Sequence, residues 1–217
     1  MLRVQQRAEH LAEIAPDLPV EQLQAMRQNG YREEMGTDVV RQVVGPMFLR
    51  HVMAGSQPRV MFFCGATIED WAAPTPLEKG IGGSETAVVE VTQLLAKDGF
   101  KPIVFNQCGS MEGDHDGVLY TDYSRFRPDN IKGDLLVSWR HPLIGLDPTP
   151  HVEQRWLWLH DMNVADRMTR EHTAGFDRVF GVSEFHADYL KKLYPFIHDD
   201  QIGFVVARYD AIALGLE

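Results

Sequence analysis

The segment Gly82-Gly83-Ser84-Glu85 stands at the start of a helical pattern and has the residue types of an anion-binding turn. Two adjacent glycines allow the backbone to come close to a ligand, and Ser84 is a favourable N-cap residue. The backbone N–H groups at a helix N-terminus carry partial positive charge and suit a phosphate group. The pattern therefore predicts phosphate binding by Gly82, Gly83 and Ser84, although a turn that merely needs glycine looks the same.

Two common phosphate-binding fingerprints are absent from this segment. The G-x-G-x-x-G pattern does not occur, and a long loop separates the preceding strand from the helix where that fingerprint needs a tight turn. No Gly-Lys-Ser/Thr follows, as it would in a Walker A loop. A nicotinamide-dependent dehydrogenase is therefore disfavoured.

Polar side chains follow three other apolar runs, at the point where each run ends. They are Arg140 and His141 after DLLVSW, His160 and Asp161 after RWLWL, and Ser183 and Glu184 after RVFGV. Arg140 suits a charge-assisted contact with phosphate or carboxylate, and a surface salt bridge is an equal alternative. His160, with an expected pKa near neutrality, suits orienting a hydroxyl or stabilising charge.

Asp161, Ser183 and Glu184 have simpler structural interpretations. Asp161 is expected either to orient the His160 imidazole or to cap the next helix, and capping is favoured. Ser183 and Glu184 have the residue types of a helix N-terminus.

Other site chemistries have little support in the sequence. Nine histidines are present, but neither H-E-x-x-H nor C-x-x-C occurs, so no metal site is expected. The G-x-S-x-G elbow of a serine hydrolase is absent, and no carboxylate pair has the spacing of a glycosidase. Trp71, Trp139, Trp156 and Trp158 could stack on sugars, but Trp156 and Trp158 alternate within a strand, which favours core packing.

The elements that must position these side chains form a repeating strand–helix pattern. Buried strands are predicted at 59–65, 102–107, 117–123, 134–139, 155–159, 178–182 and 202–206, and helices at 84–97, 163–173 and 183–193. This alternation predicts an α/β fold with a doubly wound, mostly parallel sheet. Ligands of such sheets bind outside the carboxyl ends of the strands, so the polar clusters are expected on one edge.

Residues 1–55 differ in character and are predicted to form a helical extension of a main domain at 56–217. Apolar residues at helical spacing fill this segment, and prolines and an Asn-Gly pair divide it. A helical lid packed on the main domain is the favoured interpretation, and an oligomerisation or docking module is the alternative.

Bulk composition describes an ordinary globular protein. The formal net charge of −10 argues against a nucleic-acid surface, because neutralising phosphates requires clustered Lys and Arg. The two cysteines, Cys64 and Cys108, do not make a disulfide framework. No signal peptide and no apolar run long enough to span a membrane are recognised, so a cytoplasmic protein is expected.

Several segments in order resemble the amino-terminal domain of family 4 retaining glycosyltransferases. IGGSETAVVEVTQLLAKDGFKPIVF resembles the Gly-Gly-x-Glu turn, helix and following strand, while WLHD and DRVFGVSEFHADYLKKLYP resemble the later His-Asp and Val-Ser-x-Phe segments. The resemblance covers about residues 59–206. It implies one half of a GT-B fold, in which two Rossmann-like domains face each other across a cleft.

The resemblance also implies a function and roles for the candidate residues. It implies transfer of a hexose-type sugar from a nucleotide-sugar donor to an acceptor without a metal or other cofactor. His160 would be the catalytic cleft histidine, and the Gly82-Gly83 turn would contact the phosphates of the donor. Ser84, Arg140 and Asp161 are expected from their residue types and positions to be further substrate-binding residues.

The end of the chain departs from the family's pattern. The expected Asn-Gly-Ile-Asp link is replaced by Ala207-Arg208-Tyr209-Asp210, and the sequence ends at Glu217 without the donor-binding domain. A donor-binding domain or partner chain is therefore expected to complete the enzyme. The alternative is a non-catalytic Rossmann-like module that binds a carbohydrate or a partner protein, and a nucleotide-binding protein that uses only Gly82 and Gly83 is a weaker one.

Overall fold

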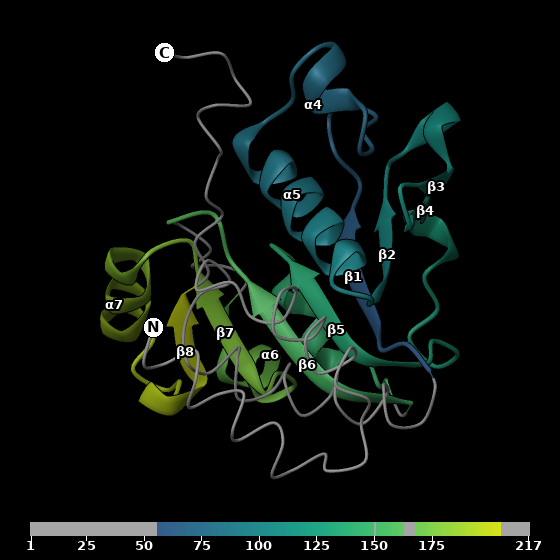
Figure 1. Cartoon of the computed structure of the whole chain (residues 1–217). Helices are drawn as coiled ribbons and strands as arrows, with labels where there is room; N and C mark the ends of the chain where they lie inside the picture. The colour runs from purple at the N-terminus through teal and green to yellow at the C-terminus, as the bar shows by residue number, and fades with distance from the viewer. Residues whose placement is uncertain (1–55, 150, 163–167, 205–217) are drawn as a thin grey trace, which may run out of the picture.

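The computed structural model describes residues 56–149, 151–162 and 168–204, which form an α/β fold around an eight-stranded sheet (Figure 1). The strands are β1 Arg59–Gly65, β2 Lys101–Asn106, β3 Gly113–His115, β4 Val118–Asp122, β5 Gly133–Trp139, β6 Val152–Trp158, β7 Arg178–Gly181 and β8 Ile202–Phe204. Their order across the sheet is β3-β4-β2-β1-β5-β6-β7-β8, and only the β3–β4 pair is antiparallel. The predicted doubly wound, mostly parallel, Rossmann-like sheet is confirmed.

Helices cover both faces of this sheet. The α-helices are α4 Thr75–Glu78, α5 Gly83–Lys97, α6 Arg170–Ala174 and α7 Glu184–Leu193, and the 3₁₀ turns are η1 Gly109–Met111, η2 Tyr123–Arg125, η3 Pro142–Leu146 and η5 Asp199–Gln201. One core cluster joins α5 to side chains such as Val60, Phe62 and Trp139. A second cluster on the opposite face joins α7 to Met61 and Leu136. The side chains of alternate residues of one strand thus pack in opposite cores, as expected for a strand buried on both faces.

The chain changes direction of winding next to β1, the central strand. β2 and β4 lie on one side of β1, while β5 and the later strands lie on the other. The boundary between β1 and β5 is therefore the topological switch point, where open α/β sheets form a crevice at the carboxyl ends of their strands.

The boundaries of α5 follow from its sequence. Gly82 is the N-cap in an extended conformation, and its backbone oxygen accepts the first helical hydrogen bond from the Thr86 N–H. Buried Ala87, Val88 and Leu95 make up part of its core face. The helix ends at Lys97, and Gly99 follows with a φ of 90°, a conformation that glycine adopts without steric cost.

Three parts of the predicted element pattern were wrong or incomplete. The short helix α4 lies within the segment predicted as a loop, and the antiparallel strand β3 was not predicted. Of the helix predicted at 163–173, the described residues show α6 at Arg170–Ala174, which Thr169 caps, and residues 163–167 lie outside the described part.

Predictions for the two ends of the chain are not tested by the described residues. The helical extension predicted at 1–55 and the link after β8 both lie outside them. Within the described ranges, no helix has the length and apolar character needed to cross a membrane.

Candidate functional site

The start of α5 carries the predicted phosphate-binding turn, with one correction. Ser84 is not the N-cap, because Gly82 takes that place and α5 already begins at Gly83. The Ser84 hydroxyl donates a hydrogen bond to Glu85 Oε2 at 2.8 Å. The Glu85 carboxylate lies so close to Gly82 that a Cβ on Gly82 would collide with it. An anion at this helix start would therefore approach beside a negative charge and needs a cation to offset it.

Arg140 supplies that cation directly after β5. Its Nε donates to Asp161 Oδ2 at 2.6 Å and its Nη2 donates to Asp161 Oδ1 at 3.0 Å, a two-pronged pairing. Its Nη1 lies 3.5 Å from the Ser84 hydroxyl. The guanidinium also lies over the Trp139 ring, 5.0 Å from the ring centre.

The backbone of Arg140 has a conformation that is unusual for a residue with a side chain. Its φ is 64°, in the left-handed region that costs a non-glycine residue about 1 kcal/mol or more. The Arg140 N–H donates to the Trp158 carbonyl at 3.0 Å, which fixes this turn to β6. The turn directs the side chain from the end of β5 towards both Asp161 and the start of α5.

His160 follows β6 and lies against two tryptophan rings. Its ring centre is 5.8 Å from that of Trp139 and 4.5 Å from that of Trp158. Burial and the nearby positive charge of Arg140 lower the pKa of His160 to about 4, although the Asp161 carboxylate opposes this shift. The expected near-neutral pKa is therefore wrong, and the imidazole is uncharged at neutral pH.

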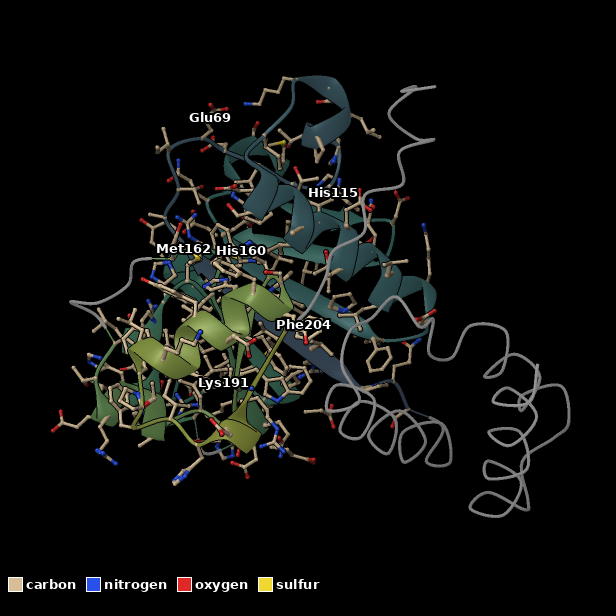
Figure 2. The ribbon with its side chains drawn as sticks, turned by 90° about the vertical axis from the view of Figure 1, so that its left-hand side faces the viewer. Glu69, His115, His160, Met162, Lys191 and Phe204 are labelled. Atoms are coloured by element: carbon tan, nitrogen blue, oxygen red, sulfur yellow. The ribbon has the colours of Figure 1, made fainter. Side chains whose placement is uncertain are left out.

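The hydrogen-bonding state of His160 leaves one nitrogen available. Within the described part of the chain, no group hydrogen-bonds to the buried Nε2 atom of His160. In Figure 2 the labelled His160 lies between the ribbons of α5 and α7. An uncharged imidazole at this position can donate or accept one hydrogen bond, which suits a hydroxyl group better than an ionised one.

His186 is a contributor that the sequence analysis did not single out. Ser183 caps α7 by accepting a hydrogen bond from the His186 N–H at 3.1 Å, as predicted for Ser183. The His186 side chain is 2% exposed, and its Nδ1 accepts a hydrogen bond from the Val182 N–H at 3.3 Å. Within the described part of the chain, its buried Nε2 has no hydrogen-bond partner. Desolvation lowers the pKa of His186. Its spacing from Ser183 is an ordinary helix pattern, and nothing in that pattern indicates that its ring is buried beside the candidate site.

The structure thus brings most of the predicted site residues together. Arg140 links Ser84 to Asp161, and His160 lies next to this pair, whereas Ser183 and Glu184 serve the start of α7. The predicted helix-capping role of Asp161 concerns a helix start within residues 163–167, which lie outside the described part, and the described helix α6 is capped by Thr169. Trp156 and Trp158 are buried, as predicted, and so are the free thiols of Cys64 and Cys108.

The location of the cluster agrees with the topology. Ser84 follows β1 in the chain and Arg140 follows β5, so their contact spans the switch point between these strands. A second contact joins the ends of β1 and β5, because His141 Nε2 lies 3.0 Å from the Cys64 carbonyl oxygen. Gly65 has a φ of 66° and leaves room for the His141 ring, because a Cβ there would lie 2.6 Å from His141 Nε2.

The described residues contain no group of three or more His, Cys, Asp or Glu side chains placed to hold a metal ion. No known protein family and no curated protein matches the sequence.

Proposed function

We propose that the chain is the amino-terminal, acceptor-side half of a retaining GT-B glycosyltransferase, which moves a sugar from a nucleotide-sugar donor to an acceptor. The observation that carries the proposal is the contact of Arg140 with Ser84 across the switch point of the sheet. It places a guanidinium beside a glycine-rich helix start, and both groups favour a phosphate. The family resemblance of the same segments supports this choice among phosphate ligands.

The chemistry of glycosyl transfer matches the charges at this cluster. Negative charge grows on the leaving diphosphate as the sugar acquires oxocarbenium character. Asp161 occupies two of the five N–H groups of Arg140, so the Nη1 edge beside Ser84 remains directed at the helix start. The α5 N-terminus and this edge would stabilise the negative charge of the leaving group.

The neutral state of His160 defines its proposed role. An imidazole with a pKa of about 4 cannot carry a proton as a cationic acid at neutral pH. Its buried Nε2 would instead orient a hydroxyl of the acceptor or of the transferred sugar. In this proposal a donor-binding domain or partner chain faces the same edge of the sheet and binds most of the nucleotide.

Calorimetric titration with UDP, GDP and UDP-glucose tests the phosphate-binding part of this function. We expect weak binding that Arg140→Ala reduces by about tenfold or more, the effect of losing a charge-assisted hydrogen bond. Arg140→Lys keeps the charge but loses the planar fork, so it should restore only part of the affinity.

Arg59→Ala is the matched control, since it removes the same charge from the amino end of β1, at the opposite edge. It should leave the affinity unchanged. If no nucleotide binds to the wild-type chain, this half does not hold phosphate by itself. The non-catalytic module that binds a carbohydrate or a partner protein would then be the better interpretation.

A further inference from the structure

The Arg140 side chain is held by groups from three different elements. Asp161, after β6, takes Nε and Nη2, while Trp139, at the end of β5, lies against the guanidinium plane. The Nη1 edge meets Ser84 of α5. An arginine side chain has many rotamers, so these contacts select one of them.

We propose that Asp161 is a positioning residue, which holds the Arg140 guanidinium so that its Nη1 edge faces a diphosphate at the start of α5. This inference rests on the proposed function, because it assigns a role within the same site. Asp161 itself does not contact the diphosphate in this arrangement, unlike the substrate-binding role expected for it from the sequence.

Asp161 is suited to this role because both of its carboxylate oxygens accept hydrogen bonds from the Arg140 guanidinium. The Asp161 side chain is 43% exposed, and the Arg140 side chain is 33% exposed. An ion pair this exposed contributes little to folding stability, so positioning is a better explanation for its two-pronged geometry.

Removal of Asp161 should change the affinity for an anion in a direction that depends on the role of Asp161. If Asp161 were only a negative charge near the ligand, its removal would tighten the binding of an anion. If Asp161 positions Arg140, its removal weakens binding, because the guanidinium must then be ordered when the anion binds. The two effects oppose each other, so the direction of the change distinguishes them.

The experiment titrates inorganic pyrophosphate into the wild-type protein and into Asp161→Ala, Asp161→Asn and Asp188→Ala. Pyrophosphate affinity should fall roughly 3- to 10-fold in Asp161→Ala, the penalty for ordering one long side chain. Asp161→Asn keeps an oxygen acceptor for Nε and should lose less. Asp188→Ala removes a carboxylate paired with Lys191 on α7 and should leave the affinity unchanged.

A second readout follows the guanidinium itself. The Nε–H resonance of Arg140, assigned by its absence in Arg140→Lys, should be protected from exchange in the wild type and lost in Asp161→Ala. Circular dichroism of each variant confirms folding, and Asp161→Asn decides the outcome if Asp161→Ala unfolds.

Unchanged or tighter pyrophosphate binding in both Asp161 variants would overturn the positioning role while leaving the proposed function intact. A wild-type protein that binds neither pyrophosphate nor any nucleotide would overturn the phosphate site, and the positioning role with it.

Discussion

At the scale of single residues, the surroundings of His160 decide its chemistry more than its identity does. The sequence shows a histidine at the end of an apolar run, and this pattern predicted its position at the edge of the sheet. It could not predict the ring of Trp139, because that contact depends on the register of neighbouring strands β5 and β6, whereas Trp158 lies only two residues before His160 in the same segment. The same packing desolvates the imidazole and changes it from a candidate cation to a neutral group.

The lowered pKa of His160 predicts a specific dependence of stability on pH. Its pKa falls from 6.5 to about 4 on folding, so the unfolded chain binds more protons between these values. The stabilisation is fully present above about pH 6.5 and is lost as the pH falls towards 4. Between about pH 7.5 and about pH 5, this one group should lower the free energy of unfolding by roughly 2 kcal/mol.

Urea unfolding of the wild type and of His160→Gln at both pH values measures this contribution of His160 to the free energy of unfolding. The wild type should lose roughly 2 kcal/mol more than the variant, because the other titrating groups are shared. Equal losses in the two proteins would show that His160 does not have a strongly lowered pKa.

At the scale of elements, η3 and α6 are joined by a contact between two glycine backbones. A Cβ on Gly145 would collide with the backbone at His172, and a Cβ on Gly175 would collide with the backbone at Gly145. Ile144 and Phe176, next to these glycines, lie in the same core cluster.

The sequence predicted the apolar strands well, because a strand buried on both faces has an uninterrupted apolar run. It could not predict this crossing, since glycine at a turn and glycine at a close approach look alike.

Gly145→Ala should therefore destabilise the fold by about 2 kcal/mol or more, through overpacking against a backbone that cannot move aside. Gly80→Ala is the matched control, because its Cβ would meet open space while its φ of 73° still disfavours alanine. That variant should cost only about 1 kcal/mol. Thermal unfolding of both variants makes the comparison, and equal losses would mean that the η3–α6 contact is not tightly packed.

At the scale of the whole molecule, large exposed apolar side chains gather in the connections that follow the carboxyl ends of strands. Ile68 follows β1 and is fully exposed, Leu77 lies in α4 and is 85% exposed, and Phe185 follows β7 and is 73% exposed. Met162 follows β6 and is 40% exposed. The candidate site lies at the same edge, so this edge carries both the polar cluster and an apolar fringe made of these four side chains.

The strand pattern predicted a common edge for the polar residues, because parallel strands all point the same way. It could not predict which of them meet, because the order of strands in the sheet comes from tertiary pairing.

This fringe should contribute little to the stability of the described fold. The double variant Ile68→Ser and Phe185→Ser should change the free energy of unfolding by no more than about 1 kcal/mol, the usual range for two exposed positions. Leu190→Ala, which truncates a fully buried side chain of α7, should cost about 2–5 kcal/mol. Chemical denaturation compares them, and a loss in the double variant as large as that of Leu190→Ala would mean that these side chains are covered in the folded protein.

The left-handed backbone of Arg140 has a consequence for directed evolution of this protein. Glycine would adopt that conformation without strain, so folding alone favours glycine at position 140. A library randomised at this codon and sorted for thermal resistance should enrich glycine, whereas the same library sorted for anion capture should retain arginine. The two selections would separate at one position, and their divergence would locate the functional edge of the sheet without any assumption about the reaction.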